Sequence, residues 1–326
     1  MKDFNEIFTS NFEPLELKGQ LFVYGIEDRF KASYDYLKTE YPQINNLRDS
    51  IDFVDYLLLD ALKPDVEYLI TIGFFPLSEM KMDLDHSIKH ALIGSYKAAF
   101  ADLRRALELA LTMIYLTSDM SDVKKAKEWV LSKLDTPHFS SSLKKLVANG
   151  RYFDFNVQFD WRKELQDFYW RLSDFSHNKG QLKSYHELNK VSAFISSTSL
   201  PTICYDTLSL FSDLYIQTIG EIVTMLALYN PVILVGIPIE DKFGLNGPVT
   251  GFYSETQSAL IHKLMPDKYK GYFKLLSERD VELLSIVDYY RSLPDLTVEE
   301  FKVQADEFNE IFHDSKNNKN ALHIIE

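Results

Sequence analysis

Residues 161–180 read WRKELQDFYWRLSDFSHNKG, and this stretch combines a helical pattern with two side chains suited to chemistry. Arg171 lies beside the apolar face of the pattern, and His177 follows six positions later. At ~100° per residue the two would point ~240° apart on an unbroken helix, so they could not share one small site there. The apolar residues that predict the buried face recur every three or four positions: Trp161, Leu165, Phe168, Tyr169, Leu172 and Phe175.

The end of this helix is predicted near His177. Asn178 and Gly180 are residue types that commonly end helices. If the helix stops there, the imidazole of His177 can turn independently of the last helical turn. A second copy of the chain that supplied the partner residue would also bring an arginine and a histidine together.

An arginine and a histidine with five residues between them, at the end of such a helix, resemble the signature of the HEPN family of helical-bundle proteins. The resemblance extends to residues 86–120, which contain HALIGSYKAAFADLRRALELALTMIYL and look like the long first helix of these proteins. It covers residues 85–231. Catalytic members usually carry a polar residue directly after the arginine, whereas this chain has Leu172.

The resemblance implies RNA cleavage without a metal ion, at a site where the pairs from two chains meet across a homodimer. His177 would act as general acid or base, and Arg171 would hold the phosphate oxygens. Asn178 would orient the phosphate. The helix hairpin would bring Arg104, Arg105 and Glu108 to the same substrate.

Two other readings of the same residues remain open at this point. Arg171 has Asp167 four positions before it and Asp174 three positions after it, so it could be occupied by ion pairs on its own helix. The bundle could also be a non-catalytic binding or regulatory module that recognises RNA, a nucleotide or a protein partner.

Composition restricts the possible functions. The 326 residues carry a net charge of −13, which argues against a protein that coats nucleic acid. Residues 85–185 nevertheless hold 16 Lys and Arg against 12 Asp and Glu, whereas the remaining residues hold 19 against 36. The basic residues therefore gather in the segment where a phosphate-bearing substrate is expected.

Sequence motifs indicate a cytoplasmic protein without a cofactor. Cys204 is the single cysteine, and the N-terminus has no basic region followed by an apolar core, so we expect a reducing compartment and no signal peptide. Neither a glycine-rich phosphate loop nor a paired-cysteine motif occurs. We expect no metal site at His86 and His90, because a third ligand is not evident.

We predict an all-α protein in three parts: an acidic N-terminal lobe at 1–84, a HEPN-like bundle at 85–232 and an acidic helical extension at 233–326. Within the bundle, one long helix is predicted from His86 to Met120, a linker at 151–160, a further helix after Gly180 and a last helix at 202–229. The last helix would carry a polar stripe of Asp206, Asp213, Gln217 and Glu221. Capping boxes are predicted at Ser254 with Gln257 and at Thr297 with Glu300.

A membrane span is not expected. Residues 222–239 contain no charged side chain, but Asn230, Pro231, Gly236 and Pro238 interrupt them. We expect a buried helix end that turns into an extended segment.

Overall fold

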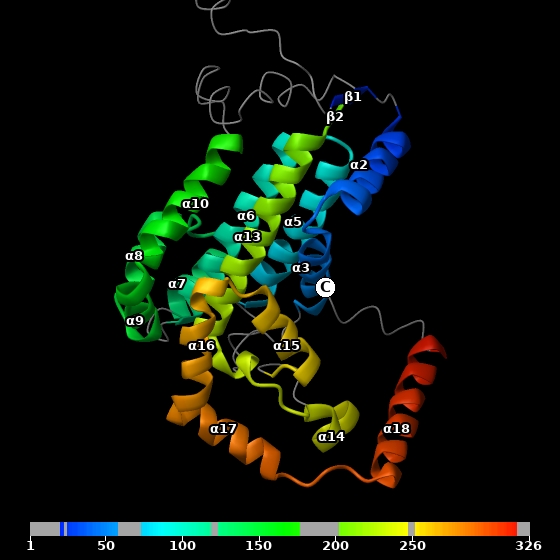
Figure 1. Ribbon diagram of the computed structural model, residues 1–326. Coiled ribbons are helices and arrows are strands. Elements are labelled where there is room, and N and C mark those ends of the chain that lie inside the picture. The colour runs from blue at the N-terminus through cyan, green and yellow to red at the C-terminus, as the bar shows by residue number, and fades with distance from the viewer. Residues whose placement is uncertain are drawn as a thin grey trace, which may run out of the picture.

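The computed structural model describes residues 20–22, 25–57, 73–118, 123–176, 202–246 and 252–317. His177, Asn178 and the helix predicted after Gly180 lie outside the described residues. The predicted all-α class is confirmed (Figure 1). The helices are α2 (Ile26–Glu40), α3 (Ile44–Tyr56), α5 (Phe74–Leu92), α6 (Tyr96–Ser118), α7 (Val123–Val130), α8 (Phe139–Leu146), α9 (Gly150–Phe159), α10 (Trp161–Ser176), α13 (Tyr205–Tyr229), α14 (Ile239–Phe243), α15 (Glu255–Leu264), α16 (Asp267–Arg279), α17 (Val281–Ser292) and α18 (Val298–Asn317), with short 3-10 helices η4 (Pro231–Leu234) and η5 (Gly244–Asn246).

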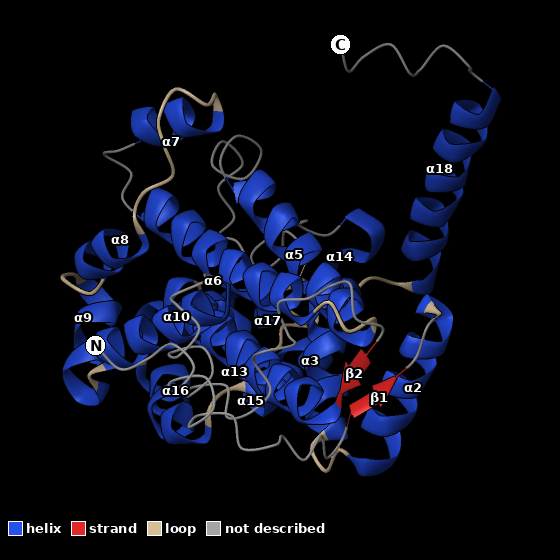
Figure 2. Ribbon diagram, turned by 90° about the horizontal axis from the view of Figure 1, so that it is seen from above, coloured by secondary structure: helices blue, strands red, loops and turns tan. Residues whose placement is uncertain are grey.

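The only strands in the described part of the chain form one short antiparallel pair. β1 (Gln20–Phe22) lies beside β2 (Thr202–Cys204), with Gln20 opposite Cys204 (Figure 2). This pair joins the N-terminal end of α13 to residues far away in the sequence.

The single helix predicted from His86 to Met120 is wrong: α5 and α6 form a helical hairpin, and α5 begins already at Phe74. Gly94 has a φ of +79° between the two helices. The amide of Ser95 donates to the carbonyl of His90 at 2.8 Å, and that of Gly94 to Ala91 at 3.0 Å. These two bonds make a Schellman motif, which ends a helix where glycine tolerates a left-handed conformation.

α6 is the central helix of the bundle. It packs against α5, α10 and α13, which surround it in Figures 1 and 2. Residues from Ala99 to Ile114 that face these neighbours are almost inaccessible to solvent, among them Phe100, Leu103, Ala106 and Leu107. Because α6 is covered on several sides, it determines where α10 and α13 lie.

The linker predicted at 151–160 is also wrong, because residues 150–159 form α9. Phe155 is fully buried among the rings of Phe159, Trp161 and Tyr269. The chain turns from α9 into α10 at Asp160, whose φ is +49°. The run of aromatic residues therefore covers the start of α10 instead of crossing between helices.

The last bundle helix is confirmed as α13, but Glu221 does not belong to an exposed polar stripe. Asp206, Asp213 and Gln217 are exposed, whereas Glu221 is only 4% exposed. Beyond α13 the chain turns into η4 and then into an extended segment, as expected. Within the described residues, no helix combines the length and the apolar character needed to cross a bilayer.

The predicted division into three parts does not follow the packing. The boundary between residues 84 and 85 falls inside α5, and one continuous core includes residues from Leu37 to Phe273. The phenol of Tyr41 donates to Asp213 of α13 at 2.6 Å, and Arg151 of α9 contacts Asp280 at 2.8 Å. The N-terminal helices and α15 and α16 are therefore integral to the bundle.

The C-terminal helices start as predicted. Ser254 and Gln257 form a capping box at α15, and Thr297 and Glu300 form another at α18. α18 extends away from the other helices in Figures 1 and 2, and it packs mainly against η5. The C-terminal helix is thus the most separate element of the described fold.

Candidate functional site on helix α10

Arg104 and Glu108 of α6 meet Tyr169 of α10 in a partly buried cluster. The guanidinium of Arg104 donates to the phenol oxygen of Tyr169 at 2.7 Å, and that phenol donates to Glu108 at 3.4 Å. Arg104 and Glu108 also form an ion pair at 3.6 Å. Burial raises the pKa of the Tyr169 phenol, so this group stays protonated and bridges α6 to α10.

Arg105 belongs to a different cluster, which joins α6 to α5. Its guanidinium contacts Asp83 at 2.8 Å and also pairs with Asp102, which in turn accepts a contact at 2.6 Å from Nδ1 of His90. The hydrogen bond that Arg105 donates to Asp83 raises the pKa of Arg105, while burial raises the pKa of the Asp83 carboxyl group. In the described part of the chain, Glu108 forms its ion pair with Arg104 and not with Arg105.

Neither cluster includes Arg171. Tyr169 and Arg171 are two positions apart, so their side chains leave α10 ~200° apart. Arg104 and Glu108 contact the Tyr169 side, whereas Arg171 is exposed on the other side. The structure therefore does not bring Arg104, Arg105 or Glu108 to Arg171 within one protomer.

The guanidinium of Arg171 is not occupied by the acidic residues of its own helix. In the described part of the chain, Arg171 makes no ion pair with Asp167 or Asp174, although both lie within one turn of it. Its neighbour Leu172 is fully buried in the core. Arg171 thus presents its charge to solvent near the end of α10, six positions before His177 in sequence.

The α10 surface, defined by residues 162, 163, 166, 167, 170 and 171, forms two adjacent rows along the helix. Arg162, Gln166 and Trp170 follow one another at four-residue steps, and so do Lys163, Asp167 and Arg171. Trp170 is 45% exposed although the opposite face of α10 is buried. In the described part of the chain, the side chains of Arg162 and Lys163, like that of Arg171, make no ion pair.

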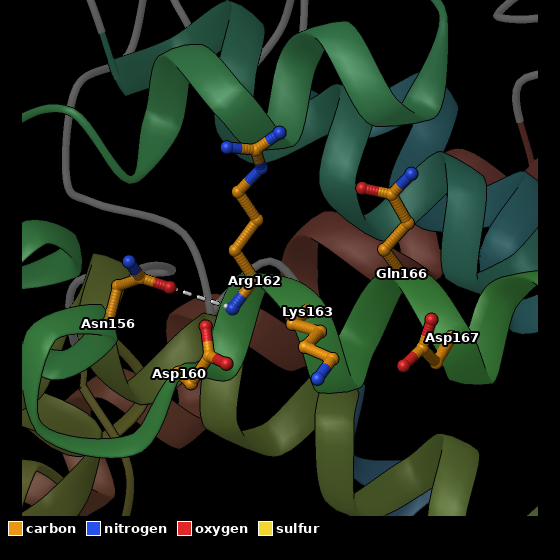
Figure 3. A pocket seen from close by; sticks show the side chains of 6 residues that line it. All are labelled: Asn156, Asp160, Arg162, Lys163, Gln166 and Asp167. Carbon is orange, nitrogen blue, oxygen red and sulfur yellow. Dashed lines mark hydrogen bonds between the residues drawn. The ribbon is translucent and has the colours of Figure 1, made fainter.

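A polar pocket of about 360 Å³ lies at the start of the α10 surface (Figure 3). Asn156 and Asp160 line it together with the first four residues of the surface. The side-chain oxygen of Asn156 accepts from the amide of Arg162 at 2.8 Å, which ties α9 to the first turn of α10. Arg162 and Gln166 extend from the same side of the helix (Figure 3). The pocket is hydrophilic and open, as suits a charged group of a larger ligand.

Such a surface can hold a polyanion that carries flat rings. Arginine and lysine attract phosphate oxygens, and an exposed indole offers a face on which a base can stack. Trp170 was not among the residues that the sequence predicted for the site. Its position in the helical pattern indicated an exposed side chain, because Trp170 falls outside the apolar face that contains Phe168, Tyr169 and Leu172.

Glu221 was also missed as a buried acid. Its Oε2 atom accepts from the indole N–H of Trp161 at 2.9 Å, and burial raises its pKa to about 7. Trp161 is the first residue of α10, so this contact fixes the start of the helix against α13. Within the described residues, Glu221 does not belong to any group of three His, Cys, Asp or Glu residues suited to a metal ion.

No family model, no curated protein and no solved structure matches this chain. The resemblance to the HEPN family therefore depends on the sequence features of residues 85–231 alone.

Proposed function

We propose that this protein is a metal-independent endoribonuclease of the HEPN type, acting on single-stranded RNA at the end of α10. The single observation that supports this proposal most is the exposed guanidinium of Arg171, free of ion pairs in the described part of its helix. An arginine committed to Asp167 or Asp174 would have little capacity left for a phosphate.

The chemistry uses the nucleophile that RNA already contains. The ribose 2′-oxygen attacks the adjacent phosphorus atom and gives up its proton, and the 5′-oxygen of the next nucleotide leaves with a proton. His177 moves these protons as general base and then general acid. Arg171 stabilises the charge that develops on the phosphate oxygens. The products carry a 2′,3′-cyclic phosphate and a 5′-hydroxyl group.

The rest of the α10 surface would hold the strand next to the scissile bond. Trp170 lies directly beside Arg171 in sequence and can stack on one base. Arg162 and Lys163 lie ~12 Å along the helix axis from Trp170 and Arg171 at 1.5 Å per residue, and they can contact phosphates farther along the strand. Asn178 orients the phosphate at the reacting centre, and a homodimer would place two such surfaces in one assembly.

The test is incubation of the purified protein with a mixed single-stranded RNA in EDTA. Wild type is expected to produce fragments with cyclic phosphate ends, and both His177→Ala and Arg171→Ala are expected to lose this activity by ~100-fold or more. Arg48→Ala is the matched control, because Arg48 is an exposed arginine of α3. Cleavage that persists in His177→Ala would reject the proposed mechanism.

One observation favours a second candidate function, which is RNA binding without cleavage. Leu172 is fully buried, so the polar group that follows the arginine in catalytic members has no counterpart here. In that case wild type retains RNA in a filter-binding assay and leaves it intact. Trp170→Ala and Arg162→Ala would weaken retention under both functions, and the state of the RNA after incubation distinguishes them.

A further inference from the structure

An apolar pocket of about 220 Å³ lies on the other side of the bundle from α10. It is enclosed by α2, α3, α5 and α13, and Figures 1 and 2 show α2 and α10 on opposite sides of α6 and α13. Leu37, Ile44, Leu47, Ile51 and Phe211 are among its wall residues. Phe30 and Tyr34, which are 44% and 50% exposed, stand at its rim.

The wall offers water very few hydrogen-bond partners. Among the described residues in the buried part of the wall, Ser212 carries the one hydroxyl group, and it already donates to the carbonyl of Leu208 at 2.9 Å. A water molecule needs two to four polar partners, and apolar cavities of about 150 Å³ stay dry and accept small hydrocarbons. This pocket is therefore suited to the hydrocarbon part of a ligand.

The mouth of the pocket is cationic. Lys38 of α2 and Arg48 of α3 line the pocket and are exposed, so their charged ends stand where it opens to solvent. Neither side chain makes a hydrogen bond or an ion pair in the described part of the chain. No carboxylate is among the described residues that line the pocket. Two cations above an apolar cavity match an anionic head on an apolar tail.

We propose that this pocket binds a small amphiphile with one anionic head group and a hydrocarbon tail, of the medium-chain carboxylate class. The tail lies between α2, α3 and α13, and the head meets Lys38 and Arg48 at the mouth. This site is separate from the α10 surface and does not depend on RNA cleavage or RNA binding.

The test is isothermal titration calorimetry of the full-length protein with decanoate below its micelle concentration. Wild type is expected to bind decanoate at one site, and 1-decanol, with the same tail but no charge, is expected to bind at least tenfold more weakly. The double variant Lys38→Glu, Arg48→Glu is expected to lose at least tenfold in decanoate affinity, because two charge-assisted contacts are reversed.

Two further variants separate the head-group contact from general charge and from the cavity. Lys31→Glu, at an exposed position of α2 outside the pocket, is the matched charge control and is expected to bind as wild type does. Ile51→Trp fills the cavity from its partly exposed edge and is expected to abolish binding while circular dichroism remains unchanged.

Three results would overturn the proposal: no binding of decanoate to wild type, equal affinity for decanoate and 1-decanol, or the same loss with Lys31→Glu as with the double variant. Because the charge variants do not alter the apolar wall, they test the site even if Ile51→Trp does not fold. RNA cleavage, whether found or absent, leaves these results unaffected.

Discussion

Glu221 is a carboxylic acid enclosed by the bundle, with one hydrogen bond from Trp161. Burial raises its pKa from an ordinary 4.5 to about 7; Glu164 acts in the same direction, and the indole N–H and Lys268 oppose it. The folded protein keeps this proton at pH values where the unfolded chain has released it. The free energy of unfolding therefore falls as pH rises from about 4.5 to about 7 and is constant, for this group, above that window.

The first prediction concerns Glu221→Gln. An amide has the shape of the protonated acid, so the variant should match wild type at pH 4.5 and be more stable by about 3 kcal/mol at pH 8, since one pKa unit is worth about 1.4 kcal/mol. Urea unfolding at the two pH values measures this difference. The exposed Glu240→Gln serves as control, and an equal effect of Glu221→Gln at both pH values would contradict the assignment.

At the scale of residues, periodicity predicts burial well on α10 and poorly on α13. Trp161, Leu165 and Leu172 are buried as their spacing indicates. Glu221 is not exposed as its spacing indicates, because every residue from Thr218 to Asn230 is covered by neighbouring helices. The run of uncharged residues after Glu221 could have predicted its burial, since a helix that is apolar on all sides is enclosed by the rest of the protein.

At the scale of elements, the turn at Gly94 determines that α5 and α6 are two helices. The apolar pattern continues through it, with Ile88 and Leu92 on one side and Tyr96 and Phe100 on the other at four-residue steps. Periodicity cannot reveal this break, because the apolar residues of α6 continue the four-residue spacing of those in α5. Glycine followed by serine was the local signal for a helix end and a new start.

The second prediction is that Gly94→Ala destabilises the protein by about 1–2 kcal/mol, because an L side chain is strained at a φ of +79°. Gly271→Ala is the matched control. Gly271 lies within α16, and a methyl group there would meet nothing within 4 Å, so alanine should stabilise the protein by about 1 kcal/mol. Thermal unfolding measures the change in stability of each variant. A loss of stability in both variants would contradict the specific requirement for glycine in the turn between α5 and α6.

The α9 helix shows a second limit of sequence reasoning. Its aromatic and β-branched residues are typical of extended segments, and they predicted a linker. Tertiary contacts override this preference, because Tyr152 and Phe155 pack against the rings of Trp161. The sequence therefore indicated an apolar segment but not its conformation.

At the scale of the whole molecule, the core is continuous across the boundaries that composition suggested. Acidic charge separates residues 1–84 and 233–326 from the basic middle, but charge lies mainly on the surface and carries no information about packing. Phe53 and Val54 of α3 and Tyr269 and Phe273 of α16 are buried in the same core as α6. The all-α class was predictable from sequence, whereas the extent of this core was not.

The third prediction follows from that continuity. A fragment of residues 85–232 lacks α3, half of α5 and α16, so it should not unfold cooperatively and should bind a dye for exposed apolar surface. A chain that ends at residue 296 lacks α18, which packs mainly on η5, and it should melt within about 2 °C of the full chain. Circular dichroism melts compare the three chains, and a cooperative melt of the 85–232 fragment would show that it is an independent domain.

The Schellman turn at Gly94 also allows α5 and α6 to fold against each other while the rest of the chain is still being synthesised. The α5–α6 hairpin forms from residues close in sequence, so it can assemble early, as local contacts form fastest. The sides of α6 that α10 and α13 later cover, including the ring of Phe100, remain open to water until residues up to 229 have been synthesised. During that interval the nascent chain presents an unprotected apolar ridge, and we expect it to be a client of the chaperones that bind such surfaces.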